Sequence, residues 1–417
     1  MEALCSAMVL VIVVAAVLTS MDTAAISSGL SRARSTGATL AEQDQERLRS
    51  MRTVDLSNYS ENRTVNLGGG PYSVTSVVRW LRDSNGEPLS CTNGSTQADY
   101  LLIGSTVSSG TMQGQSVHVE SLLAPPVGSF GPTQGSFGVQ VLDSAGAPVE
   151  DMDVTITGPD TAVLPTNELG CSIFGYIPPG SYTATVNHSG WVDAGGQTVV
   201  TKSGTVSGGN VNAVTVQYDE AASVGVTFDT VVGIGSPQPS TAKSITAANS
   251  GVPPSGARQF TASARAGSFN ASNLFPFASA YAVYAGTCAA ANPQTYDSNY
   301  FATAPGSVTT SPGWSYQTVV RVPAVNLLVT RGGLPFSAAH VVLTAIGTGC
   351  TEKITAYTNA LGALFDPGMP FGVYSICVDD TLRSRTLAAT VSNTSPGGTL
   401  PVTVSIPTSG TTGSVCT

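Results

Sequence analysis

The feature that most constrains the fold is an internal repeat of turn residues in the second part of the chain. Both copies follow the order G-x-P, T-N-x-x-G and P-x-G-x-Y, with apolar runs between the motifs. Proline presets φ and glycine accepts a positive φ, so these motifs predict tight turns between short strands. The matching positions are Gly146, Pro148, Val154, Thr157, Thr166, Asn167, Gly170, Pro178, Gly180 and Tyr182 in the first copy, and Gly333, Pro335, Val341, Thr344, Thr358, Asn359, Gly362, Pro370, Gly372 and Tyr374 in the second.

This order of strands and turns resembles the transthyretin-like seven-stranded sandwiches of the Cna-B and carboxypeptidase-regulatory type. The resemblance implies that the G-x-P turn starts a hairpin and that P-x-G-x-Y leads the final core strand. We therefore expect β-sandwiches at residues 133–220 and 324–417. The stretch 221–323 carries further strand-like runs separated by Pro, Gly and Asn clusters. A third sandwich is expected there.

The second constraint is the N-terminal run Ala3–Met21, which contains no charged residue. As a helix, this run would be about 28 Å long, close to the thickness of a bilayer's hydrocarbon core. A secretory signal peptide begins with a basic region, which this run lacks. We therefore expect a membrane anchor with an extracytoplasmic body. Arg32 and Arg34 argue for the opposite orientation by the positive-inside rule, whereas the cysteines and the low charge of the body favour the first.

The helix is expected to continue beyond the membrane, over residues 1–52. No proline occurs between Asp22 and Met51, and apolar or small residues recur there at helical spacing. This stripe consists of Leu30, Ala33, Gly37, Leu40, Leu48 and Met51, and the charged residues expected mostly off it are Glu42, Asp44, Glu46, Arg47 and Arg49. After the helix, the runs 74–83, 98–107 and 116–126 predict the strands of a small β region at 53–132.

The segment MEALCSAMVLVIVVAAVLTSMDTA, followed by AEQDQERLRSM, is similar to the start of type IV pilin-like proteins, which share a prepilin methylation and cleavage segment. Glu2 matches the family's glutamate and Ala3–Met21 match its apolar helix, whereas the basic leader and its glycine are missing here. The resemblance implies a long helix laid on a small sheet. It also implies that the Glu2 carboxylate pairs with the N-terminal amine of a neighbouring subunit during assembly. Alternatively, Glu2 sits in the headgroup region of an ordinary anchor.

Seven cysteines are present, and Cys5 lies inside the apolar run. The other six contain no C-x-x-C pair, which argues against a zinc or thioredoxin-like site. In an exported chain they fit up to three disulfides, and fifteen connectivities are possible. We favour Cys350 with Cys377, because both lie in one repeat copy; buried free thiols are the alternative. The six are Cys91, Cys171, Cys288, Cys350, Cys377 and Cys416.

The sequence presents no catalytic constellation. Its three histidines are isolated: His118 is expected on a solvent-facing strand position, His188 in a turn and His340 just before a strand. The acidic clusters Glu150–Asp153 and Asp379-Asp380 could bind calcium, but solvated turns are the simpler interpretation. We therefore expect no enzyme activity, no cofactor and no metal site.

A net charge of −9 without basic runs excludes nucleic acid as an expected partner. The leading interpretation is a mainly β, membrane-anchored minor pilin-like or pseudopilin-like subunit of a type IV pilus or related secretion filament. Its partners would be other pilin subunits, reached through the N-terminal helix, and membrane lipid. The alternative is a stand-alone surface-anchored binding or adhesion protein whose sandwiches recognise carbohydrate or protein.

Overall fold

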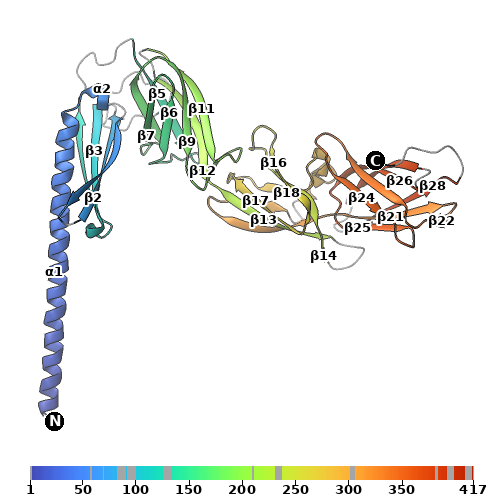
Figure 1. The fold of residues 1–417 in the computed structure, drawn as a ribbon, viewed down its shortest axis with the longest axis horizontal. Helices are drawn as coiled ribbons and strands as arrows, with labels where there is room; N and C mark the ends of the chain where they lie inside the picture. Colours follow the sequence, from blue (N-terminus) through green and yellow to red (C-terminus); the bar gives the residue numbers. More distant parts are fainter. Residues whose placement is uncertain are drawn as a thin grey trace. The chain divides into compact units, whose positions relative to one another are not determined.

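The computed structural model shows two compact units, Met1–His188 with Val199–Val216, and Ser189–Thr198 with Gln217–Thr417 (Figure 1). The described residues are 2–56, 59–68, 70–81, 91, 100–124, 133–208, 211–230, 237–300, 306–380, 384–391, 399–408 and 416. Among them, the side chains of 2–20, 22, 23, 54, 384, 386–391 and 399–401 are not described. The predicted fold class is confirmed: a single long N-terminal helix precedes a small sheet and tandem β-sandwiches.

Helix α1 (Glu2–Arg49) is 48 residues long, as the absence of proline predicts. One short helix, α2 (Thr53–Leu56), follows it. In the second half of α1, Ala33, Leu40 and Leu48 are buried, and they belong to the predicted apolar stripe. The helix therefore docks through the face that its i, i+3 and i+4 pattern specifies.

The docking surface of α1 is a four-stranded antiparallel sheet of order β1-β2-β3-β4, called here the N-terminal sheet. Buried and less buried side chains alternate along β2 and β3, because successive strand residues point to opposite faces. Tyr72, Val74 and Val107 share one core cluster with Ala33 and Leu40 of the helix. The strands are β1 (Ser60–Leu67), β2 (Gly70–Leu81), β3 (Tyr100–Ser108) and β4 (Ser116–Leu123).

The first sandwich packs a β12-β5-β8 sheet against a β11-β9-β6-β7 sheet in the first unit. Its centre contains Phe137 from one sheet and Tyr182 from the other, with ring centroids 6.2 Å apart. The strands are β5 (Gly135–Leu142), β6 (Asp153–Thr157), β7 (Thr161–Pro165), β8 (Cys171–Ile177), β9 (Gly180–Asn187), β11 (Val199–Val206) and β12 (Val211–Glu220).

An apolar core joins the N-terminal sheet to the first sandwich. Trp80 of β2 lies 5.5 Å from the ring of Tyr176, and Leu48 of the helix belongs to the same cluster. Because Trp80 and Leu48 pack against β8, that edge strand is buried along its whole length. Disulfide Cys91–Cys171 crosses the same junction.

The second unit contains two further sandwiches with closely related strand orders. In the second sandwich β13 pairs with β14, β17 and, in parallel, β20, and the facing sheet has the order β16-β15-β18-β19. Both sheets contribute to one core that includes Val226, Ile245 and Val283. The strands are β13 (Ala222–Thr230), β14 (Gln238–Pro239), β15 (Ala242–Ala248), β16 (Ala257–Ala266), β17 (Ser268–Leu274), β18 (Tyr281–Ala285), β19 (Ser307–Val308) and β20 (Ser315–Arg321). The short strand β10 (Trp191–Asp193) pairs with the end of β12 in this unit.

In the third sandwich β21 pairs with β22, β25 and, in parallel, β28, opposite a β24-β23-β26-β27 sheet. The second and third sandwiches thus have the same strand order. In each, the last strand, β20 or β28, pairs in parallel, so these sandwiches are mostly but not wholly antiparallel. The strands are β21 (Ala324–Arg331), β22 (Leu334–Pro335), β23 (His340–Ile346), β24 (Lys353–Tyr357), β25 (Ala363–Asp366), β26 (Gly372–Asp379), β27 (Ser384–Val391) and β28 (Thr399–Ile406). Three short 3-10 helices complete the described elements: Gly110–Met112, Ala289–Ala291 and Pro293–Thr295.

The T-N-x-x-G motif makes the same hydrogen bonds in both copies. The Thr166 hydroxyl donates to the Val149 carbonyl and accepts the Met152 amide, and the Thr358 hydroxyl bonds Phe336 and Ala339 in the same way. The following asparagines, Asn167 and Asn359, each accept two backbone amides across the turn. Gly170 and Gly362 close these turns at φ values of 66° and 69°.

The P-x-G-x-Y motif forms a tyrosine corner. The Tyr182 hydroxyl donates to the Pro178 carbonyl, and the Tyr374 hydroxyl to the Pro370 carbonyl, each over 3.0 Å. In the second sandwich, Tyr281 donates instead to Phe275, six residues upstream. This different spacing explains why the repeat motif does not extend to that sandwich.

The disulfides correct the predicted pairing of Cys350 with Cys377. Cys350 bonds Cys288 of the second sandwich, and Cys377 bonds Cys416. Cys377 lies opposite Val342 in β23, whereas Cys350 lies beyond the end of that strand at Ile346. At about 3.3 Å per residue, at least about 13 Å of strand separates the two sulfur positions, which is beyond disulfide reach.

Candidate functional site

The two halves of α1 have different surroundings. The described side chains from Met21 to Gly29 are exposed, including Met21 at 66% and Ile26 at 59%. From Ala33 onward one face of the same helix is buried. Figure 1 shows the first half of α1 projecting beyond the N-terminal sheet. The docked half therefore holds the helix on the N-terminal sheet, and the described side chains of the projecting half are exposed.

The predicted assembly residue Glu2 begins α1, and its side chain lies outside the described residues. Over the part of the chain that the structure describes, no helix is both long and apolar enough to cross a bilayer. The run Ala3–Met21, on which the predicted span rests, has described side-chain burial only at Met21. The membrane span therefore stays a prediction.

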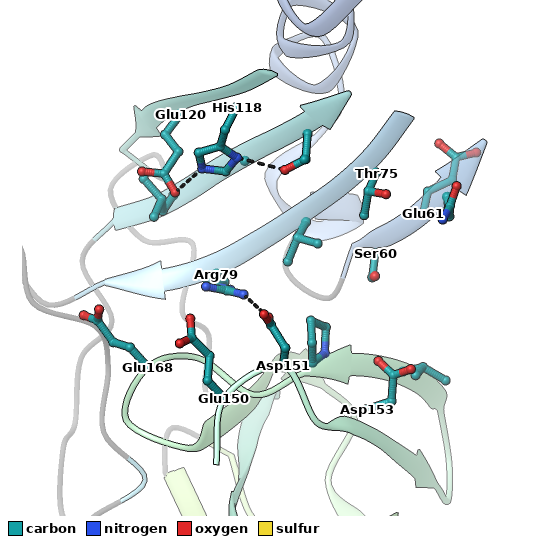
Figure 2. Close-up of a pocket in the computed structure, with 17 residues that line it drawn as sticks. Ser60, Glu61, Thr75, Arg79, His118, Glu120, Glu150, Asp151, Asp153 and Glu168 are labelled. Atoms are coloured by element: carbon teal, nitrogen blue, oxygen red, sulfur yellow. Dashed lines mark hydrogen bonds and ion pairs between the residues drawn. The ribbon is translucent and has the colours of Figure 1, made fainter. Parts of the chain in front are cut away.

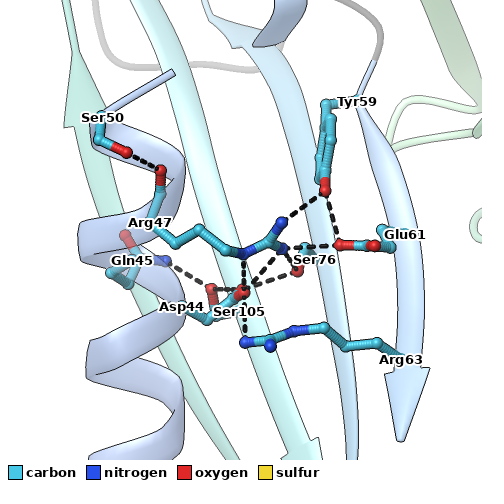
Figure 3. Close-up of polar contacts among 9 residues, drawn as sticks. All are labelled: Asp44, Gln45, Arg47, Ser50, Tyr59, Glu61, Arg63, Ser76 and Ser105. Carbon is cyan, nitrogen blue, oxygen red and sulfur yellow. Dashed lines mark hydrogen bonds and ion pairs between the residues drawn. The ribbon is translucent and has the colours of Figure 1, made fainter.

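The docked half contains a buried polar cluster, the Asp44 network, which consists of Asp44, Arg47, Arg63, Ser76 and Ser105 (Figure 3). Asp44 is fully buried, and its Oδ2 accepts hydrogen bonds from Ser76 at 2.6 Å and Ser105 at 2.7 Å. Its Oδ1 accepts from Arg47 at 2.9 Å and from Arg63 at 3.1 Å. One helix carboxylate is thereby bonded to three neighbouring strands, which fixes both the position and the rotation of α1 on the sheet.

The charge states of this network follow from these contacts. Burial by itself raises the pKa of Asp44, but the bonds from Ser76, Ser105 and Arg47 outweigh it and leave the pKa below its ordinary value. Burial lowers the pKa of Arg47, and its bonds to Tyr59 and Asp44 raise it overall. Asp44 and Arg47 are therefore an ion pair at neutral pH. The Tyr59 hydroxyl and Arg47 also bond Glu61, at 2.6 and 2.7 Å, and lower its pKa.

Gln45, the next residue, extends the helix–sheet contact to the edge strand. Its amide nitrogen donates to the carbonyls of Ile103 and Val119 over 3.0 Å each, and its carbonyl accepts from Ser121. Gln45 is almost fully buried. The side chain thus joins β3 and β4 to the helix.

Sequence reasoning placed Asp44 off the apolar stripe, and this prediction was wrong. Asp44 lies four residues after Leu40 and four before Leu48, both of which face the sheet. That i, i+4 spacing was the available signal, because a charged residue within a buried stripe needs partners. The partners Ser76 and Ser105 had no signal of their own.

The opposite face of the N-terminal sheet lines an acidic cleft of about 840 Å³ (Figure 2). Its wall on the sheet carries Arg79 and His118, and its wall on the first sandwich carries the predicted acidic cluster. Arg79 pairs with Asp151 at 3.1 Å. The six carboxylates lining the cleft are Glu61, Glu120, Glu150, Asp151, Asp153 and Glu168. These groups can accept hydrogen bonds and attract cations, yet among the described residues no three are grouped closely enough to hold a metal ion.

The three histidines differ in setting. His118 lies on an open strand position as expected, half exposed, with Thr106 bonded at Nδ1 and Glu120 at Nε2. His188 directly follows β9. His340 begins β23, where it bonds the Asp379 carboxylate at 3.0 Å.

The pair Asp379-Asp380 was expected to form a solvated turn, and the structure corrects this expectation. Asp379 is buried and also accepts the backbone amide of Cys416 at 2.7 Å. Asp380 pairs with Arg331 at 3.1 Å. Both carboxylates hold elements of the third sandwich together.

No family model and no curated protein matches the sequence. Among solved structures, the chain is similar to the Bacillus anthracis TIE protein at 12% identity and a TM-score of 0.22, over 81% of this chain and 68% of that one. It is also similar to BcpA, the major pilin subunit of Bacillus cereus, at 11% identity and a TM-score of 0.20, over 66% and 100%. A streptococcal ancillary pilin matches at 9% identity and a TM-score of 0.20, over 88% and 87%. Similarities of this size do not assign a family.

Proposed function

We propose that this chain is a pilin-like structural subunit of a type IV pilus or related secretion filament. The first half of α1 anchors it in the membrane and later packs against other subunits, and the sandwiches are displayed outside the cell. The observation that carries the proposal is the division of α1 into a docked half and a projecting half that contains the uncharged apolar run Ala3–Met21.

The physical reason is the free energy of exposing that run to water. Ala3–Met21 contains mostly aliphatic side chains, and each fully exposed Val, Leu, Ile or Met costs about 1.5–3 kcal/mol relative to burial. The N-terminal sheet ends short of this run (Figure 1). A bilayer or the apolar helices of other subunits would supply the missing apolar surroundings.

The docked half supports the same proposal. A subunit that assembles through a projecting helix must hold that helix rigidly against its body. The Asp44 network and Gln45 provide this, because they bond α1 to β2, β3 and β4 through buried groups.

Membrane anchoring is tested by placing a charge in the apolar run. Arginine at a helix centre in the bilayer costs about 2.5–3.5 kcal/mol, so three of them together, Val9→Arg, Ile12→Arg and Val14→Arg, cost roughly 8–10 kcal/mol besides the lost apolar side chains and should shift the protein from the alkaline-washed membrane fraction to the soluble fraction. The same three positions changed to leucine are the matched control and should stay in the membrane. Equal membrane retention of both variants would contradict the anchor.

Assembly is tested separately at Glu2. We propose that its carboxylate pairs with the N-terminal amine of a neighbouring subunit. Glu2→Gln should therefore keep the protein in the membrane and reduce its oligomers in crosslinking and sedimentation. A stand-alone surface-anchored binding protein would instead remain membrane-bound and monomeric in both forms.

A further inference from the structure

The first and third sandwiches can be matched residue by residue, because the glycine of the T-N-x-x-G motif makes the same backbone bond in both. The Val141 amide donates to the Gly170 carbonyl, and the Val329 amide donates to the Gly362 carbonyl. Strand β5 of the first sandwich therefore corresponds to β21 of the third, and β8 corresponds to β25.

This match pairs Ile173 of β8 with Phe365 of β25, since each lies three residues after its motif glycine. Ile173 lies opposite Gly138 in β5, and Phe365 lies opposite Asn326 in β21. Leu327, the neighbour of Asn326, belongs to the core of the third sandwich. Because successive strand residues point to opposite faces, Ile173 and Phe365 both lie on the sheet face that points away from the core, called here the outer face.

In the first sandwich the outer face is a docking surface. Ile173 is only 8% exposed, because it packs in one cluster with Trp80 of the N-terminal sheet and Leu48 of α1. In the third sandwich Phe365 is 46% exposed, and Leu328 on the neighbouring strand is exposed as well. The third sandwich therefore keeps the apolar character of this docking surface but leaves it in contact with solvent.

Two further leucines border the outer face of the third sandwich. Leu334 and Leu361 lie in the turns just before Pro335 and Gly362, and both are largely exposed. These turns pack tightly together, since a Cβ atom on Gly362 would lie 2.6 Å from the carbonyl oxygen of Val329 and 3.2 Å from the Cα atom of Pro335. An exposed apolar surface of this kind is typical of a protein–protein contact.

The second sandwich shows that an outer face in this chain need not be apolar. Its strands β13 and β17 place Gly225 opposite Asn270 and Thr227 opposite Ser268, with Val319 of β20 beside Thr227. Asn270, Thr227 and Ser268 are exposed. This face is mostly polar, so the large apolar side chains on the third sandwich are not a general property of the repeat.

The described side chains on the outer face of the third sandwich carry no charge. At its borders, Arg331 pairs with Asp380, and Asp366 pairs with Arg265. Two copies of this face can therefore approach without the repulsion that like charges would cause. The outer-face residues are Asn326, Leu328, Thr330, Ala363, Phe365, Thr403 and Ser405.

We propose that the outer face of the third sandwich binds the same face of a second copy of the chain, in a closed two-fold dimer. An uncharged apolar surface is complementary to itself, and a two-fold axis buries it on both copies at once. The N-terminal sheet of another copy could not be held there as it is on the first sandwich, because Ala363 replaces Cys171, which forms the disulfide to Cys91. The contact goes beyond the proposed function, since it joins chains through a sandwich and not through α1.

The contact itself is tested with Phe365→p-benzoylphenylalanine in the full chain, in detergent micelles. Under illumination this side chain forms a covalent bond to a group that it touches. In a mixture of isotopically labelled and unlabelled chains, a product that contains both kinds is intermolecular. We expect position 365 to be linked to β21 or β25 of the second copy, in covalent dimers without larger products. The same dimers should form in Glu2→Gln, because this contact does not require the helix.

Three outcomes of this experiment would overturn the proposal. A link to the N-terminal sheet of another copy would mean that the face takes that sheet instead. Covalent products larger than dimers would mean a contact that does not close on itself. Absence of any intermolecular product would mean that the face does not self-associate, and the assembly tested at Glu2 would be unaffected by that result.

The contribution of the apolar side chains is tested by sedimentation equilibrium of the full chain in detergent. Leu328→Asn combined with Phe365→Asn removes four apolar side chains from each dimer, so the Kd of the dimer should rise at least about tenfold. Ile346→Asn is the matched control, because Ile346 is 47% exposed and lies on the opposite sheet of the same sandwich. It should leave the Kd unchanged.

All three substituted side chains are exposed, so the variants should keep the fold, which thermal unfolding checks. An unchanged Kd in the double variant would contradict the two-fold contact. An equal rise in Ile346→Asn would also contradict it, because the association would then be unspecific apolar adhesion.

Discussion

Both faces of the N-terminal sheet carry charged side chains, but these are buried on one face and exposed to solvent on the other. On the covered face, Asp44 is fully buried and both its oxygens are hydrogen-bonded. On the open face, Glu120 and His118 have 47% and 52% of their side chains exposed, although the His118 Nε2 atom lies 2.9 Å from the Glu120 carboxylate. The same strands β2, β3 and β4 supply both faces.

This difference in solvent exposure indicates which charged side chains contribute most to the free energy of unfolding. A charge in contact with water loses little when its partner is removed, because solvent replaces the interaction. A buried charge has no such replacement, and its partners are left unsatisfied together. The helix-covered face should therefore be sensitive to substitution, and the cleft face tolerant.

The largest effect is expected from Asp44→Ala. It leaves Arg47, Arg63 and two serines without their common acceptor, and breaking a buried ion pair in this way costs about 3–5 kcal/mol. Guanidinium unfolding followed by the fluorescence of Trp80, in a chain that carries Trp191→Phe and Trp314→Phe so that Trp80 reports alone, measures the free energy of unfolding. Glu120→Ala on the open face is the matched control and should change it by no more than about 0.5 kcal/mol. Equal losses from both variants would refute the comparison.

A smaller loss is expected from Gln45→Ala. The variant leaves the carbonyls of Ile103 and Val119 without the amide that they accept, at a cost of about 2–3 kcal/mol. Gln43 on the exposed side of the helix provides the control Gln43→Ala, which should be neutral. If hydrogen exchange of the β4 amides is unchanged in Gln45→Ala, this residue does not hold the edge strand.

Lowering the pH should remove the stabilisation that the Asp44 carboxylate contributes on the covered face. The folded pKa of Asp44 is depressed below 3.8, so its stabilisation is fully present above that pH and is lost as the pH falls through the folded pKa. Urea unfolding of the natural chain and of Asp44→Asn, measured from about pH 5 to about pH 2, should show a steeper loss for the natural chain. Parallel curves would mean that Asp44 is not the titrating group.

The smallest effect is expected from Arg79→Ala in the cleft. Its ion pair with Asp151 is 3.1 Å long, but Asp151 is 74% exposed. Such a surface pair contributes about 0–1 kcal/mol. Added salt should reduce even this difference, and a loss comparable to that of Gln45→Ala would show that the cleft face is as critical as the covered face.

The turns and the long helix could be predicted because their causes are local. Thr166 bonds Val149 and Met152, and Tyr182 bonds Pro178, all within the same repeat copy. The spacing of the motif residues in the sequence therefore predicts these hydrogen bonds directly. In the second sandwich, Tyr281 uses another spacing, and the pattern gives no match although the strand order is closely related.

The disulfides and the partners of Asp44 could not be predicted because they join distant segments. Cys91–Cys171 and Cys288–Cys350 have separations of 80 and 62 residues, and each connects two neighbouring modules rather than closing one. Ser105 lies 61 residues from Asp44. Only the packing of modules decides which of several chemically equivalent cysteines or serines come within bonding distance.

By itself, the sequence determined the long helix, the repeated turns and the strands between them, since each depends on φ preferences, hydrogen bonds and periodicities within a few tens of residues. The tertiary structure decided that a charged residue, Asp44, is buried on the docked face of the helix. It also decided how the cysteines pair and which carboxylates remain in water. These outcomes depend on desolvation, which is a property of a residue's final neighbours and not of its place in the chain.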